Sequence, residues 1–112
     1  KLGKRAMRAG MDFETKEDAF ECIKAETAEL EEAMQESSQE HIEEEFGDLL
    51  FSCVNTARHL GIDAELALTK ASEKFIKRFK ETEKLVTLSG ADMKALSIEE
   101  LDVFWRQAKQ NI

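Results

Sequence analysis

The absence of proline from all 112 residues is the feature that most constrains the fold of this chain. Without a residue that interrupts backbone hydrogen bonding, and with few turn signals, long helices joined by short loops are expected. Apolar residues recur at steps of three and four, which is the period of an amphipathic helix. We therefore expect one all-α domain over residues 1–112, with four helices at about residues 16–36, 40–60, 64–88 and 98–110.

Local signals mark where these helices begin and end. A Ser or Thr followed three residues later by an acidic residue is typical of a helix N-terminus, and a Gly just after a helix favours a left-handed C-cap. A short basic segment, residues 1–9, is expected to be a linker or the end of an incoming helix that stops near Gly10. The expected caps are Thr15 with Asp18, Ser37 with Glu40, Gly61, Asp63, and Ser97 with Glu100.

Three of the predicted helices have a continuous apolar face, which we expect to form the core. On the first helix this face consists of Phe20, Ile23, Thr27, Leu30 and Met34. On the second helix it consists of Ile42, Phe46, Leu49, Leu50, Cys53, Val54, Ala57 and Leu60. On the third helix the inward positions are Leu68, Ala71, Phe75 and Phe79.

Acidic residues lie unusually close to these apolar faces. On the second helix Glu45 and Asp48 are three residues apart, so that their side chains project to the same place, and the polar row continues through Ser52 and Asn55. The first helix has the same spacing in Glu26 and Glu29. Two such helices facing one another would bring four carboxylates together, and these would repel unless cations bind. Oxygen ligands favour Mg²⁺ or Mn²⁺ over zinc.

The acidic residues have two other interpretations. The first, surface acid, stays open, and the second, a di-iron site, can be tested against the sequence. Surplus surface acid with no bound metal is about as compatible with a single pair of carboxylates. A di-iron bundle requires Glu-x-x-His, but His41 follows Ser38 at that spacing and His59 follows Thr56. We interpret both histidines as surface or helix-end residues.

Bound Mg²⁺ suits phosphate chemistry. The sequence has no GxxxxGK[ST] loop, no Rossmann glycine pattern and no Ser-His-Asp or Cys-His set, which points to direct attack by water. Lys74 and Arg78 flank Phe75 and are candidates to reach phosphate oxygens, whereas the other lysines of that helix are expected to be solvated. Trp105 is expected either to pack in the core or to stack on a nucleobase.

Composition limits the partners and the compartment. The formal net charge of -8 argues against a nucleic-acid partner. No apolar run is long enough to span a bilayer and no leader pattern is visible, so we expect no membrane association and a cytoplasmic location. Cys22 and Cys53 have no CxxC spacing and are expected to be reduced thiols. Because the first residue is Lys1, the chain is expected to be part of a longer polypeptide.

Four motifs together resemble the MazG nucleoside triphosphate pyrophosphohydrolases, and in particular the catalytic C-terminal half of the two-domain members. The motifs are AETAE at residues 25–29, EEEFGDLLF at 43–51, VNTARHLG at 54–61 and KASEKFIKRF at 70–79, and the flanks KRAMRAGMDFET and VFWRQAK are also similar. The resemblance implies an all-α helical bundle completed by homodimerisation. It also implies Mg²⁺-dependent hydrolysis of NTPs or dNTPs to a nucleoside monophosphate and pyrophosphate.

The resemblance also implies roles for individual residues. The family signature EExxE, then ExxD, maps the catalytic, metal-holding positions onto Glu26, Glu29, Glu45 and Asp48. The implied substrate-binding residues are Asn55 in the site, Lys74 and Arg78 at the triphosphate, and Trp105 near the base or sugar.

This sequence departs from the family pattern at three positions. Ala25 replaces the first Glu of EExxE, Ser72 replaces an Asn, and Phe13 replaces a Trp. Glu44 is a candidate substitute for the missing Glu. Since few groups could recognise a base edge, we expect broad base specificity. Ala25 motivates the alternative, a non-catalytic nucleotide-binding or dimerisation domain.

Overall fold

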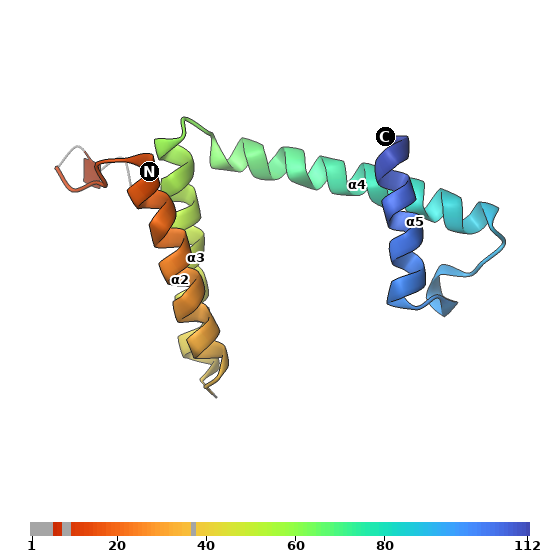
Figure 1. The fold of residues 1–112 in the computed structure, drawn as a ribbon, viewed down its shortest axis with the longest axis horizontal. Coiled ribbons are helices and arrows are strands. Elements are labelled where there is room, and N and C mark those ends of the chain that lie inside the picture. Colours follow the sequence, from red (N-terminus) through yellow and green to blue (C-terminus); the bar gives the residue numbers. More distant parts are fainter. Residues whose placement is uncertain (1–5, 8–9, 37) are drawn as a thin grey trace. The chain divides into compact units, whose positions relative to one another are not determined.

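The computed structural model describes residues 6–7, 10–36 and 38–112, and this part of the chain contains helices and no strand. The helices are α2 (Lys16–Met34), α3 (Gln39–His59), α4 (Ala64–Leu88) and α5 (Ile98–Asn111), with a 3₁₀ turn η1 (Met93–Ala95) before α5 (Figure 1). The expected all-α class is confirmed, and each predicted helix end lies within two residues of the observed one. Most of the basic segment 1–9 lies outside the described residues.

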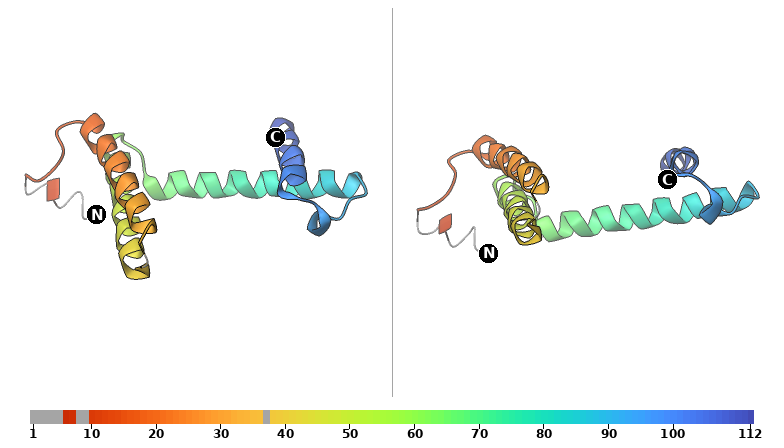
Figure 2. Two further views of the ribbon diagram at one scale, coloured as in Figure 1. Left: turned by 60° about the horizontal axis from the view of Figure 1, so that its bottom comes forward. Right: turned by 90° about the horizontal axis from the view of Figure 1, so that it is seen from below.

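The chain forms two compact units, Lys1–Ala64 and Glu65–Ile112. The first unit contains the antiparallel pair α2 and α3, which lie side by side in every view (Figures 1 and 2). The second contains α5 and nearly all of α4. Among the described residues, no helix is both long enough and apolar enough to cross a membrane.

Small side chains form the contact between α2 and α3. Ala19 and Ala33 are fully buried on α2, and Ser52 and Thr56 are buried on α3. The Thr56 hydroxyl lies 3.0 Å from the carbonyl oxygen of Ala19 and 2.8 Å from that of Ser52. Small residues let two helix backbones approach closely, and the buried hydroxyl finds its acceptors on the two backbones.

The predicted core faces are only partly buried in the single chain, and their largest side chains are exposed. Phe20 and Met34 of α2 are exposed, as are Phe46 and Leu50 of α3, with Met34 at 63%. The buried positions of α3 are Ser52, which belongs to the polar row expected at the margin of the apolar face, and Thr56, which belongs to neither set. The helical period identifies an apolar face correctly, but it does not determine whether the same chain covers that face.

Three of the five expected helix-end signals are observed and one N-cap is shifted by one residue, whereas the cap expected from Asp63 stays a prediction. Thr15 accepts a hydrogen bond from the Asp18 backbone N–H, and Ser97 with Glu100 forms a complete capping box. Gly61 has φ +71° after α3, the left-handed conformation that favours glycine. The N-cap of α3 is Ser38, which accepts from the His41 N–H, and Ser37 lies outside the described residues.

The second unit has few buried side chains. Val86, Thr82 and Ala108 are buried, while the predicted inward residue Leu68 is 69% exposed. The Trp105 ring packs against Phe75 of α4 with ring centroids 5.3 Å apart. Near the end of α5, Asn111 Nδ2 donates to Glu81 Oε2 at 3.0 Å. These contacts connect α5 to α4 within the unit.

Candidate functional site

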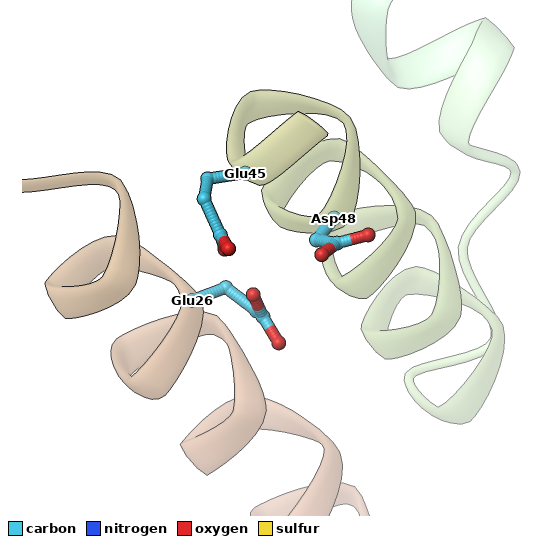
Figure 3. A group of neighbouring side chains, drawn as sticks. All are labelled: Glu26, Glu45 and Asp48. Atoms are coloured by element: carbon cyan, nitrogen blue, oxygen red, sulfur yellow. The ribbon is translucent and has the colours of Figure 1, made fainter. Parts of the chain in front are cut away.

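Three carboxylates from two helices meet in the first unit. Glu26 of α2 and Glu45 and Asp48 of α3 each offer one oxygen, and these oxygens all lie within 4.8 Å of one another. Figure 3 shows Glu45 and Asp48 on neighbouring turns of α3, with the Glu26 side chain directed toward them from α2. We call these three residues the carboxylate cluster.

The two helices position the carboxylate cluster through spacing and close packing. A separation of three residues places Glu45 and Asp48 on one face of α3. The close contact through Ala19 and Thr56 brings α2 near enough for Glu26 to reach them. Glu45 is the most enclosed of the side chains, with 12% exposure, whereas Asp48 is exposed and Glu26 is half-buried.

The electrostatics of the cluster show that its negative charges are costly to hold together. Burial raises the pKa of the Glu26 carboxyl, and the charges of Asp48, Glu45 and Glu29 raise that pKa further. The pKa of the Cys22 thiol is raised by burial and by the charges of Glu26 and Asp48. A cation placed among these groups would remove the repulsion that disfavours the ionised state.

Glu29 was predicted as the fourth member of the site and lies outside the carboxylate cluster. It is exposed, three residues after Glu26 on α2, and its charge still affects the pKa of Glu26. Its role as a metal ligand stays a prediction. Ala25 and Glu44 are both exposed, and Glu44 is not part of the cluster.

His41 contacts the cluster, which the sequence interpretation missed. Its Nε2 lies 3.3 Å from Glu45 Oε1, and its Nδ1 lies 2.8 Å from Glu36 Oε2. The hydrogen bond to Glu36 raises the pKa of His41 most, burial opposes this, and Glu45 adds a further increase. The four-residue spacing of His41 and Glu45 on one helix was the signal that could have identified the contact.

A second polar group links the segment before α2 to the end of α3. Arg58 donates two hydrogen bonds to Asp12, at 3.0 Å to Oδ2 and 2.6 Å to Oδ1. His59 Nε2 lies 2.9 Å from Asp12 Oδ1, and Arg58 also donates to Asn55 Oδ1 at 2.7 Å. The Arg58 guanidinium holds the pKa of the Asp12 carboxyl well below its usual range.

The location of His59 agrees with the helix-end alternative of its prediction. It is the last residue of α3, and its side chain is 12% exposed. No local pattern predicts its contact with Asp12, because the two residues are 47 positions apart.

Beside this polar group is a pocket of about 330 Å³ in the first unit. Asn55, predicted to line the site, lies here and not in the carboxylate cluster. It follows Asp48 by seven residues, so the two share one face of α3 and are about 10 Å apart along the helix axis. The lining residues are Ala6, Met11, Asp12, Phe13, Phe51, Asn55 and Arg58.

The other predicted substrate-binding residues belong to the second unit. Lys74 is exposed and Arg78 is partly exposed on α4. Trp105 is partly buried and packs on Phe75, in agreement with the expectation that it contributes to packing. Contacts of these three residues with a substrate stay predictions.

The donor set of the carboxylate cluster fits a hard divalent cation. All three ligand atoms are carboxylate oxygens, which suit Mg²⁺ or Mn²⁺, and neither a thiolate nor an imidazole belongs to the set. The fold and the site thus define an all-α protein with a cluster of three carboxylates between two antiparallel helices.

Comparison with known proteins identifies the family. Residues 14–82 match the MazG nucleotide pyrophosphohydrolase domain, and the chain belongs to the MazG family. It is 43% identical over 109 residues to the nucleoside triphosphate pyrophosphohydrolase/pyrophosphatase MazG of Thermotoga maritima, which covers 97% of this chain. It is 40% identical over 115 residues to the nucleoside triphosphate pyrophosphohydrolase of Escherichia coli K12, which covers 98% of this chain.

The chain spans less than half the length of these relatives, 42% of the Thermotoga protein and 43% of the Escherichia protein. It is also 40% identical over 76 residues to YabN of Bacillus subtilis, over 67% of this chain and 16% of YabN. The resemblance expected from the sequence motifs is therefore confirmed at the level of the family.

Proposed function

We propose that this domain hydrolyses nucleoside triphosphates between the α- and β-phosphates, with Mg²⁺ as cofactor and broad base specificity. Water supplies the oxygen that enters the α-phosphate, the bond from the α-phosphorus to the bridging oxygen breaks, and pyrophosphate leaves. The observation that carries the proposal is the convergence of three carboxylates within 4.8 Å in a chain of the MazG family.

The residues of the carboxylate cluster would hold the metal ion, with Glu29 at the edge of the site as a fourth ligand. When bound, Mg²⁺ supplies positive charge that neutralises phosphate oxygens in the transition state. The enclosed Glu45 side chain fixes one ligand, because its neighbours leave it little freedom to move. Lys74 and Arg78 would neutralise the rest of the triphosphate charge.

The domain acts as a homodimer in this proposal. Support comes from the large apolar side chains that the single chain leaves exposed on α2, α3 and α4. Apolar surface of this extent is unusual on a monomer and is typical of an interface. The implied nucleotide partners are NTPs and dNTPs.

Product analysis tests the proposed reaction. The protein is incubated with each of four NTPs and Mg²⁺, and the phosphorus-containing products are resolved by ³¹P NMR. We expect nucleoside monophosphate and pyrophosphate in equal amounts. Release of orthophosphate, or no turnover, contradicts the proposal. Glu45→Gln should lose activity, and Glu31→Gln, an exposed position on α2 outside the cluster, should retain it.

A variant at Ala25 distinguishes an enzyme from a domain that binds nucleotide without hydrolysing it. Ala25→Glu restores the family motif, and because position 25 is exposed the substitution needs no repacking. If the unaltered chain binds NTP with Mg²⁺ but hydrolyses it only after this substitution, the domain in its natural form is not an enzyme.

A further inference from the structure

The pocket beside Arg58 lies in the first unit and is separate from the carboxylate cluster. Its volume of about 330 Å³ lies at the low end of the range for small-molecule sites. Its apolar walls come from Met11, Phe13 and Phe51, and its polar edge comes from Asp12, Asn55 and Arg58. Aromatic walls beside a few polar groups are the usual composition of a site for a planar ring.

Most of the polar atoms at this edge are already paired. Asp12 Oδ1 accepts from the Phe13 N–H at 2.8 Å as well as from Arg58 and His59, and Oδ2 accepts from Arg58. The Asn55 carbonyl oxygen accepts from Arg58. The acceptors of the pocket are therefore occupied by groups of the protein itself.

One hydrogen-bond donor remains open. Because Asn55 Oδ1 faces Arg58, its Nδ2 amide is the group left for a ligand, and it has no partner among the described residues. The Arg58 Nε–H also has no hydrogen-bond partner in the described part of the chain, but it is buried and therefore not accessible to a ligand. A pocket whose accessible unpaired polar group is a donor is complementary to a carbonyl oxygen.

The pocket lies at a suitable place along α3. Asn55 is two helical turns beyond Asp48 on the same face, about 10 Å along the axis. In a nucleotide the ribose separates the phosphates from the base. A nucleotide whose phosphates lay at the carboxylate cluster would reach this pocket with its base if it lay along α3.

We infer that this pocket receives the nucleobase and favours bases with a ring carbonyl, namely uracil, guanine and cytosine, over adenine. The inference rests on the proposed function and adds a base preference to it. Asn55 Nδ2 donates to the base carbonyl, and the base packs against Phe13 and Phe51. One neutral hydrogen bond corresponds to a preference of about two- to tenfold, so all four nucleotides remain substrates.

Nucleoside titration of the whole chain tests the inference without requiring turnover or metal. Uridine and adenosine are added separately to ¹⁵N-labelled protein, and amide shifts are followed by NMR. We expect shifts at Phe13, Phe51 and the Asn55 side-chain amide, with uridine binding about two- to tenfold more tightly. Shifts that centre on Trp105, no shifts in the pocket, or equal affinities overturn the inference.

Two variants separate recognition from packing. Asn55→Asp keeps an acceptor for Arg58 but removes the open donor, so the uridine-to-adenosine ratio should fall to about one. Phe51→Ala should weaken both nucleosides, whereas Phe46→Ala, equally exposed on α3 but outside the pocket, should not. An unchanged ratio in Asn55→Asp, or equal effects of the two Phe variants, overturns the inference.

The outcome is distinguishable from a failure of the proposed function. If NTPs are cleaved to monophosphate and pyrophosphate but nucleosides do not bind this pocket, the reaction stands and the base site is wrong. If nucleosides bind here with the expected preference but no NTP is cleaved, the base site stands and the reaction is wrong.

Discussion

At the scale of single residues, the carboxylate cluster makes metal binding measurable as stability. An ion that binds only the folded chain stabilises it by mass action, by about 2.7 kcal/mol at 100 times its Kd. Glu45 is the most enclosed ligand, so we predict that Glu45→Gln abolishes most of the Mg²⁺-dependent rise in Tm. Thermal unfolding with and without Mg²⁺ checks this, with Glu31→Gln as control. An unchanged rise in the Glu45 variant contradicts the metal site.

The raised pKa of Glu26 gives a pH dependence with a definite sign. A carboxyl whose pKa is higher in the folded than in the unfolded state favours folding at low pH, and this stability is lost as pH rises through the raised pKa. We therefore predict that Mg²⁺ stabilises the protein more at pH 7.5 than at pH 5, because at pH 5 protons compete for Glu26. Glu26→Gln should reduce this difference in Mg²⁺-induced Tm shift between the two pH values.

The pH dependence of stability that Asp12 contributes has the opposite sign. Its pKa is lowered, chiefly by the hydrogen bond from Arg58, so its contribution to stability is fully present above the ordinary value of 3.8 and is lost below it. We predict that acid unfolding begins at higher pH in Asp12→Asn than in Asp18→Asn, because Asp18 forms no ion pair within the described part of the chain. Circular dichroism between pH 2 and 6, an interval chosen to cover the carboxyl range, checks this.

At the scale of helices, the contact between α2 and α3 depends on one buried hydroxyl. Thr56 reaches the Ala19 carbonyl across the helix pair, whereas the buried Thr82 bonds only to Arg78 of its own helix. Valine has nearly the same shape as threonine but no hydroxyl. We predict that Thr56→Val costs about 1 kcal/mol more than Thr82→Val and lowers Tm by roughly 4 °C more. Denaturant unfolding gives the comparison, and equal losses would show that the cross-helix bond contributes nothing.

The helices and their caps could be predicted because their causes are local. Thr15, Gly61 and the Ser97–Glu100 box act within one turn, so sequence spacing contains the required information. The cluster of Glu26, Glu45 and Asp48 was predictable in part: the spacing on α3 places Glu45 and Asp48 together, whereas the same spacing on α2 also included Glu29, which lies outside the cluster. The contact of Asp12 with Arg58 was not predictable, since it joins positions 46 apart and depends on how the segment before α2 packs.

At the scale of the whole molecule, many large apolar side chains of the helices are not covered by the chain that carries them. The fully buried apolar side chains of the described residues are small, apart from Val86, while Phe20, Phe46, Leu50 and others remain in solvent. The sequence predicted these large residues as core because it cannot distinguish a face covered by the same chain from one covered by another. Exposure of such a surface is costly at roughly 25 cal/mol per Å².

Because this apolar surface is exposed on the single chain, we expect the protein to self-associate, and the extent of self-association depends on protein concentration. We predict that the protein sediments as a homodimer and that dilution lowers its Tm, because a partner that binds only the folded state stabilises it. Leu50→Lys places a charge on the exposed apolar face of α3 and should shift the mass toward the monomer. Glu43→Lys, a charge change at an exposed polar position of the same helix, should not. A monomer with concentration-independent Tm would mean that these apolar residues are covered by something other than a second copy.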